Sequence, residues 1–141
     1  MKLFYSFICL FVLSACSGSS EENENCNFLL DINVYETINL SLPQYSQLPF
    51  PGNSVYIANA GNAGIIVANT GVGYFAWDAS DPNEIPSDCS TLVPSGLEAT
   101  GGCSNNKYSL VTGEPLENTE LQCSLKFYRV EQNGNYLTIY N

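Results

Sequence analysis

The chain has 141 residues, of which 45% are hydrophobic and 13% charged, so it is long and apolar enough to bury the core of one domain. It contains no histidine, which excludes histidine acid–base catalysis, Ser-His or Cys-His nucleophile activation and every metal site with imidazole ligands. The formal net charge of −10 argues against binding to nucleic acid or anionic lipid, because such binding depends on clustered Lys and Arg.

The first residues have the pattern of an export signal. Lys2 precedes an apolar run over 3–13, which is shorter than the roughly 20 residues of a transmembrane helix. The run ends in Leu13-Ser14-Ala15-Cys16, which resembles the lipobox of bacterial lipoproteins. We therefore expect a signal peptide over 1–15, acylation of Cys16, and a lipid-anchored protein of the bacterial cell envelope, at the outer membrane. Ordinary secretion is the alternative.

The residues after Cys16 predict a flexible acidic tether over 16–25. Three glutamates stand there among serines and asparagines, with little that could pack. This stretch also resembles the surface-export signals of some Gram-negative lipoproteins. Both interpretations, a solvated linker and an export signal, stay open. We expect one folded domain over 26–141.

The domain shows no sustained helical spacing, whereas short apolar runs recur between turn residues. We expect strands over 32–40, 55–58, 65–68, 74–77, 107–111, 125–131 and 136–140. Residues 78–94 are polar and proline-rich, which predicts a long irregular loop. Asn133-Gly134 predicts a two-residue hairpin turn, since both residues tolerate positive φ. The pattern predicts an all-β domain of roughly eight to ten strands.

Several segments, in order, resemble the Rieske iron–sulfur domain. They are residues 64–67, 74–83, 108–116 and 125–130 with 137–139. The resemblance extends from about residue 30 to residue 141. It implies an antiparallel β sandwich or barrel, with two loops at one end that hold a two-iron two-sulfur cluster in the family.

The first of these loops lacks the ligands of the family. A Rieske cluster takes one Cys and one His from each loop, because imidazole replaces thiolate on one iron. The Cys-Pro-His pattern falls on Asp81-Pro82-Asn83, so Asp81 and Asn83 occupy the two ligand positions.

The second loop lacks them as well. Without gaps from Tyr108, the ligand positions are Gly101 and Ser104. A gapped alternative places Cys103 and Asn106 there, which supplies one thiolate and no imidazole. On either alignment we expect no cluster and no other cofactor.

The resemblance also implies a pairing of the cysteines. Many respiratory members carry a disulfide between their two cluster loops. On the alignment without gaps, Cys103 stands at the corresponding place in the second loop, and Cys89 is its counterpart in the first if residues 84–88 include a short insertion. Cys26 and Cys123 are left, and the family's fold brings the first strand against the last ones. Four cysteines permit three pairings, and the sequence does not choose among them. A four-thiolate metal site is disfavoured, because no two of these cysteines are closely spaced.

Acidic residues are frequent in the predicted loop, namely Asp78, Asp81, Glu84 and Asp88. Such a group can chelate a cation, and paired carboxylates can do acid–base work. The spacing lacks the alternate ligands and central glycine of a calcium loop, however. We expect a solvated acidic loop and no metal.

Aromatic residues are numerous, with nine Tyr, seven Phe and one Trp, and could form a carbohydrate-binding surface. Most fall within predicted strands, where rings pack for structural reasons. Core packing is therefore the favoured role of Phe75 and Trp77. The roles of Tyr136 and Tyr140 stay open.

These observations predict a non-enzymatic binding or structural module of the cell envelope, with a Rieske-like domain that lacks its cluster. The expected partner is an envelope protein or a glycan. The alternative is an electron-transfer or oxidoreductase component with a two-iron two-sulfur cluster. A ligand-binding lipoprotein in glycan or nutrient handling is a third possibility, which would need a pocket.

Overall fold

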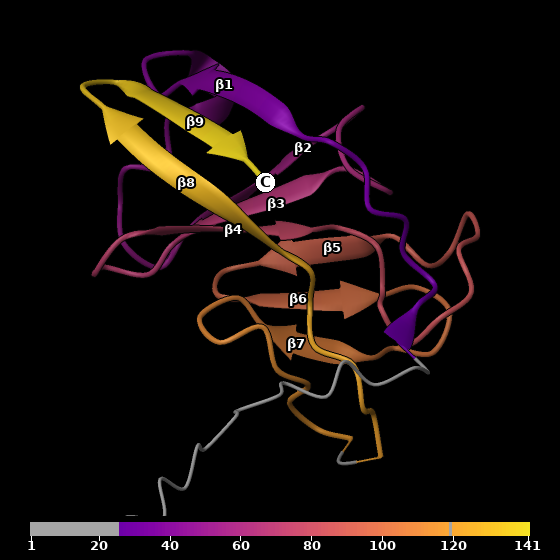
Figure 1. Cartoon of the computed structure of the whole chain (residues 1–141). Coiled ribbons are helices and arrows are strands. Elements are labelled where there is room, and N and C mark those ends of the chain that lie inside the picture. Colours follow the sequence, from indigo (N-terminus) through magenta and orange to yellow (C-terminus); the bar gives the residue numbers. More distant parts are fainter. Residues whose placement is uncertain (1–25, 119) are drawn as a thin grey trace, which may run out of the picture.

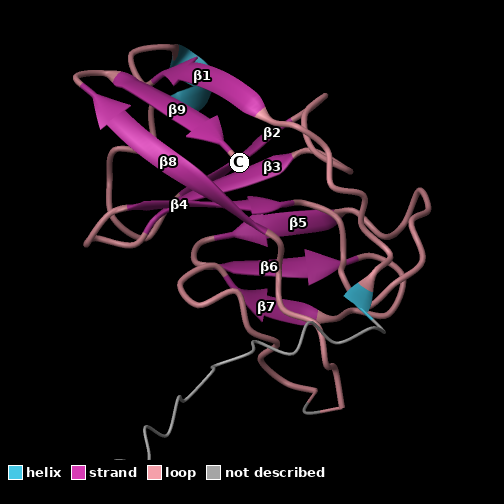
Figure 2. Cartoon of the chain, viewed as in Figure 1, coloured by secondary structure: helices cyan, strands magenta, loops and turns pink. Residues whose placement is uncertain are grey.

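The structure is a computed structural model that describes residues 26–118 and 120–141. The predicted signal peptide, the acylation of Cys16 and the tether lie outside these residues. Among the described residues, no helix has the length and apolar character that crossing a membrane requires. The described chain is all-β, as predicted, with nine strands and a short 3-10 helix (Figure 2).

The strands form two antiparallel sheets. In chain order the elements are β1 (Tyr35–Asn39), the 3-10 helix η2 (Pro43–Tyr45), β2 (Ser54–Ile57), β3 (Ile65–Asn69), β4 (Tyr74–Asp78), β5 (Leu92–Ser95), β6 (Glu98–Gly101), β7 (Lys107–Ser109), β8 (Phe127–Asn133) and β9 (Tyr136–Tyr140). The larger sheet has the order β1-β9-β8-β4-β3-β2, and the smaller has the order β5-β6-β7. Figure 1 shows β1 and the β8–β9 hairpin at one end of the molecule and β5, β6 and β7 at the other.

Strand β8 changes its partner along its length. Its first two residues, Phe127 and Tyr128, pair with Trp77 and Ala76 of β4, and from Arg129 onward it pairs with β9. A twisted sheet whose central strand serves two neighbours in this way curls. The result is the open, curled antiparallel sheet visible in Figure 1.

Strand β3 lies between two hydrophobic cores and contributes side chains to both. All five of its residues are buried. Side chains alternate across a strand, so Ile65 and Val67 enter one core while Ile66 and Ala68 enter the other. A continuous apolar run is what a strand covered on both faces requires. This is why 65–68 could be predicted as a strand from its composition.

The two cores have different members. The larger-sheet core consists of Val34, Ile38, Leu40, Leu48, Ile57, Ile65, Val67, Ala76, Tyr128, Leu137 and Ile139. The smaller-sheet core consists of Ile66, Ala68, Trp77, Ala79, Leu92, Ala99, Tyr108, Leu110 and Leu125. Trp77 is buried there and donates its indole N–H to the carbonyl of Leu110, 3.0 Å away, so its expected core role is observed. Phe75 packs against the same core.

Two strands differ from the sequence-based expectation. Part of the predicted irregular loop is β5, whose Leu92–Ser95 segment pairs with the unpredicted β6. Pro94 lies within β5, and a proline is tolerated there because β5 is an edge strand. The Glu-Ala-Thr-Gly sequence of β6 has weak strand propensity, and its strand conformation follows from hydrogen bonding to both neighbours.

The ends of other elements also differ. The first strand spans Tyr35–Asn39 rather than 32–40, and β7 ends at Ser109 because the chain turns there, with the N–H of Gly113 donating to the Ser109 carbonyl. In the last hairpin Asn133 pairs with Tyr136, so the two turn residues are Gly134 and Asn135, one position later than predicted. Gly134 takes a φ of 58°, which glycine adopts without a steric penalty.

Candidate functional site

The first of the two loops leaves β4 and is fixed by backbone hydrogen bonds on both sides. The Ala79 N–H donates to the carbonyl of Gly64, and the Leu92 N–H donates to the carbonyl of Ala79. The Asp81 N–H donates to the carbonyl of Ser90. These bonds draw the segment after β4 into the molecule. Asp78 and Asp81 are completely buried, so the expectation of a solvated loop is wrong for both. Sequence could not show this, because carboxylates are buried only when partners far along the chain satisfy them.

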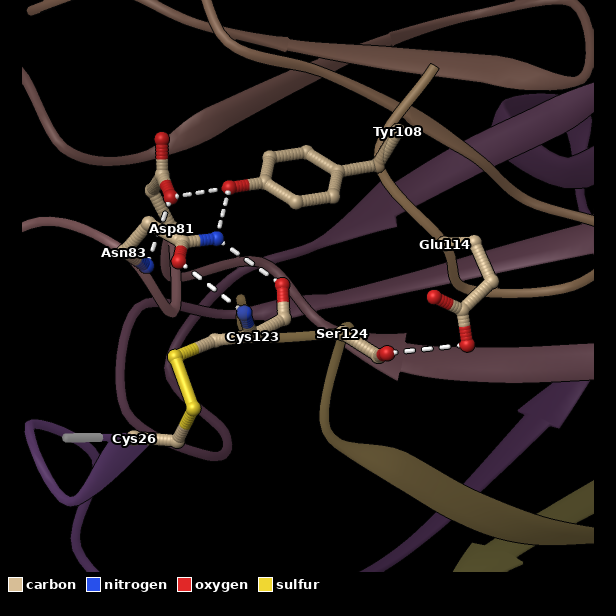
Figure 3. The surroundings of a disulfide bond; sticks show 7 residues. All are labelled: Cys26, Asp81, Asn83, Tyr108, Glu114, Cys123 and Ser124. Atoms are coloured by element: carbon tan, nitrogen blue, oxygen red, sulfur yellow. Dashed lines mark hydrogen bonds between the residues drawn. A yellow bond between two sulfur atoms is a disulfide. The ribbon is translucent and has the colours of Figure 1, made fainter. Parts of the chain in front are cut away.

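Asp81, the first predicted ligand position, is the centre of a buried hydrogen-bond network (Figure 3). Its Oδ1 accepts the hydroxyl proton of Tyr108 at 2.5 Å and the backbone N–H of Asn83 at 2.9 Å. Its Oδ2 accepts a side-chain N–H of Asn106 at 3.0 Å. Both carboxylate oxygens are thus occupied by protein donors.

Asn83 occupies the position of the family's first imidazole ligand. Its side chain connects the Asp81 network to Cys123, in the segment before β8. Its Nδ2 donates to the Tyr108 hydroxyl at 2.7 Å and to the Cys123 carbonyl at 2.8 Å. Its Oδ1 accepts the Cys123 N–H at 3.0 Å. The side-chain amide therefore pairs with the backbone of Cys123 much as a neighbouring strand would, as Figure 3 shows.

The Tyr108 hydroxyl donates to Asp81 and keeps its proton, so it is a permanent donor within the network. Burial raises the pKa of its hydroxyl far above the ordinary value, and the hydrogen bond to Asp81 raises it further. The phenol therefore keeps its proton throughout the physiological range. It is a hydrogen-bond donor to Asp81 rather than an acid or a base.

In the second loop, Gly101 lies against Asp81 and has no side chain. A Cβ on Gly101 would lie 2.8 Å from Oδ2 of Asp81, so the small residue makes room for the buried carboxylate. Ser104 instead lies on the surface and donates to Glu84 of the first loop. On the gapped alignment, Asn106 is the residue that reaches Asp81. The structure thus brings Gly101 and Asn106 to Asp81, and leaves Ser104 apart from it.

Two disulfides connect the same region. Cys89 is joined to Cys103 between the two loops, and Cys26 is joined to Cys123. These are the pairs that the Rieske resemblance implied. The first bridge lies on the surface, whereas Cys123 of the second is buried beside Asn83 (Figure 3).

The residues at this end do not fit a Rieske cluster. The ligand positions present a carboxylate, an amide, a hydroxyl and a glycine, and the whole chain has no histidine to ligate the second iron. Asp81 and Asn83 already bond to Tyr108 and Cys123. The four cysteines of the described residues are all joined in disulfides, which leaves no thiolate among them.

A cation site in the acidic stretch has no support in the described part of the chain. Within 26–118 and 120–141, no three His, Cys, Asp or Glu side chains lie close enough together to hold a metal ion. Asp78 and Asp81 are each enclosed in a separate network, while Glu84 accepts the hydrogen bond of Ser104.

A second buried carboxylate network was not predicted. Oδ2 of Asp78 accepts the Tyr128 hydroxyl at 2.6 Å, and the backbone and side-chain N–H groups of Asn62 at 2.8 and 3.0 Å. Oδ1 accepts the N–H of Ser80 at 2.9 Å. Burial, followed by the bond to Asp78, raises the pKa of Tyr128 far above its usual value. The two residues are 50 positions apart, and no local signal in the sequence connects them.

Comparison with known proteins gives likeness at the level of fold. No family model and no curated protein matches the sequence. One similar structure is described as a complex of reduced oxygenase and oxidized ferredoxin in carbazole 1,9a-dioxygenase, with 17% identity and a TM-score of 0.53, covering 76% of this chain and 93% of that one.

A second similar structure is the ferredoxin of carbazole 1,9a-dioxygenase from Nocardioides aromaticivorans. Its identity is 15% and its TM-score 0.49, over 73% of this chain and 95% of that one. At such identities a structural likeness speaks for the fold and for nothing more specific. The chain has a Rieske-like fold.

Proposed function

We propose that this chain is a non-enzymatic binding or structural module, built on a Rieske-like fold that has lost its cluster and anchored by lipid to the bacterial cell envelope. The observation that carries the proposal is the hydrogen-bond network of Asp81, Asn83 and Tyr108, which takes the place of the first pair of cluster ligands. A site whose polar groups are satisfied by one another has a structural role, because each bond would have to break before a ligand could replace it.

The lipid anchor and the envelope location are supported by two independent features. The sequence over 1–16 has the basic start, short apolar run and lipobox-like end of a lipoprotein signal. The domain also contains two disulfides, which persist in oxidising compartments outside the cytoplasm.

The competing proposal is an electron-transfer component that carries a two-iron two-sulfur cluster. What favours it is the kind of protein with which the fold is shared, since the similar structure at a TM-score of 0.53 contains a ferredoxin in complex with an oxygenase. By this comparison alone, electron transfer is the better-supported function. The donor set of this chain weighs against it, because a Rieske cluster needs imidazole and the chain has none. Fold alone does not decide between the two.

The decisive experiment is metal and cofactor analysis of the full-length protein, purified without oxygen. We expect a colourless protein without stoichiometric iron or acid-labile sulfide. Stoichiometric iron and sulfide, with visible absorption and an electron-paramagnetic signal that appears reversibly on reduction, would refute the cluster-free proposal and establish electron transfer. Any iron found is assigned with two variants. Asp81→Ala should release iron held at the loops, and Glu131→Ala, at an exposed carboxylate of β8, should not.

A further inference from the structure

A polar pocket lies beside the loop region, between the turn over 59–64 and residues 87–91. Its volume is about 480 Å³, within the usual range for small-molecule sites. The side chains that line it include Tyr56, Asn59, Asn62, Ser87, Asp88 and Thr91. None of these residues belongs to the network of Asp81.

One wall of the pocket carries an aromatic ring held in a fixed position. Tyr56 donates its hydroxyl to the carbonyl of Ala63 at 2.8 Å. Its ring lies directly over Gly64, where any Cβ would overlap the ring, and Gly64 has a φ of 98°. Tyr56 is nevertheless 43% exposed. A partly exposed ring that lines a pocket and is held in position can stack on a ligand.

Both walls of the pocket are held in place by bonds within the protein. On one side, Asn62 donates its backbone and side-chain N–H groups to the carboxylate of Asp78. The side-chain amide of Asn62 also accepts the N–H of Leu30 at 2.8 Å and donates to the Leu30 carbonyl at 3.0 Å. On the opposite side the disulfide of Cys89 with Cys103 fixes the segment next to Asp88. A site held in its binding conformation avoids much of the entropy cost of ordering on binding.

Polar groups in the pocket remain available to a ligand. Asn59 and Asp88 are exposed and line the pocket, and among the described residues no hydrogen bond of either side chain is found. Together they offer an amide that both donates and accepts and a carboxylate that accepts. No lysine or arginine lines the pocket, and the chain has a net charge of −10, which disfavours an anionic ligand.

We propose that this pocket binds a neutral saccharide. Flat amide and carboxylate groups can pair with the hydroxyls of a sugar, while the ring of Tyr56 can stack on its apolar C–H face. This inference rests on the proposed function and deepens it, since it assigns a glycan as the partner of the binding module.

The test is a titration of the isotope-labelled full chain with maltotriose, cellotriose and chitotriose at millimolar concentration, followed by amide chemical shifts. We expect at least one trisaccharide to shift the amides of residues 56–64 and 87–91. Tyr56→Ala should weaken that binding by about tenfold, which corresponds to about 1.4 kcal/mol. Tyr56→Phe keeps the ring but loses the hydrogen bond to Ala63, so its affinity should lie between those of Tyr56→Ala and the natural chain. Tyr136→Ala removes a similarly exposed tyrosine from β9 and should leave affinity unchanged.

Trilysine, tested in parallel, distinguishes a saccharide site from a site for cationic peptides. The saccharide proposal is overturned if no trisaccharide shifts these amides, if Tyr56→Ala binds as tightly as the natural chain, or if trilysine alone shifts them. An iron-free protein that binds no trisaccharide refutes the pocket's assignment and leaves the cluster-free module intact. A protein that contains the iron–sulfur cluster refutes the proposed function whatever the titration shows.

Discussion

The two halves of the domain each bury one Asp–Tyr hydrogen bond, but they are otherwise held together differently. One half is the large-sheet half, which consists of β1, β2, β8 and β9 and the side chains of β3 and β4 that face the larger-sheet core. It is held together by the hydrogen bonds of the six-stranded sheet and by the Asp78–Tyr128 pair. The small-sheet half, β5–β7 with residues 79–91, 102–118 and 120–125, has short strands and the Asp81–Tyr108 pair. It also contains the Cys89–Cys103 disulfide and Cys123 of the disulfide to Cys26. A region built on short strands gains stability from covalent links, as small secreted domains do.

The disulfides, which link the small-sheet half, are expected to give the largest effect on stability. Replacing Cys26 and Cys123 together by Ala removes a link across 97 positions and should lower the free energy of unfolding by about 4.7 kcal/mol. The matched variant at Cys89 and Cys103, across 14 positions, should lose about 3 kcal/mol. Urea unfolding of both double variants measures the difference. Equal losses would mean that loop length does not determine these contributions.

The buried carboxylates come next. Asp78→Ala removes the acceptor of four hydrogen bonds, and Asp81→Ala the acceptor of three, so each should lower the free energy of unfolding by about 3 kcal/mol. The exposed control Glu131→Ala should stay within about 0.5 kcal/mol.

Hydrogen exchange shows whether the two carboxylates act locally. Asp78→Ala should expose the amide of Asn62 and spare that of Asn83, and Asp81→Ala should do the reverse. Loss of protection at both amides in both variants would contradict a division of the domain into two separately bonded halves.

The pH dependence gives the smallest effect. Folding raises the pKa of both Tyr108 and Tyr128 above the usual 10.0, so their stabilising contribution is fully present below pH 10. Above that pH the unfolded chain loses the phenolic proton and the folded chain keeps it. Stability should therefore fall by about 1.4 kcal/mol per pH unit for each tyrosine.

Tyr108→Phe and Tyr128→Phe isolate the two contributions. Each variant should remove one tyrosine's share of the slope when unfolding is followed from about pH 9 to about pH 11. If Tyr108→Phe left the pH dependence of the unfolding free energy unchanged, the Tyr108 hydroxyl of the natural protein would ionise in the folded state. That result would contradict the assignment of Tyr108 as a permanent donor. The same reasoning applies to Tyr128 in the large-sheet half.

The sequence predicted those parts of the fold that have a local cause. The apolar run at β3 and the alternation in β9 follow directly from which faces are covered. β6 and Pro94 in β5 were missed because their strand conformation depends on neighbouring strands rather than on their own residues.

The candidate site was predicted only in part. The resemblance identified Asp81 and Asn83 as ligand positions, but it could not show that Tyr108 and Cys123 bind them, because those contacts span 25 and 40 positions. The Tyr56 pocket could not be predicted either. Its ring position depends on the positive φ of Gly64 and on a turn held by Asp78.

Strand β3 has a consequence for the domain as a whole. Ile65 and Val67 face one core and Ile66 and Ala68 the other, so neither core is complete without the same five residues. A fragment containing only one of the two sheets would leave an apolar surface in water. The domain should consequently melt in a single all-or-none transition, and its boundaries cannot be drawn between the sheets.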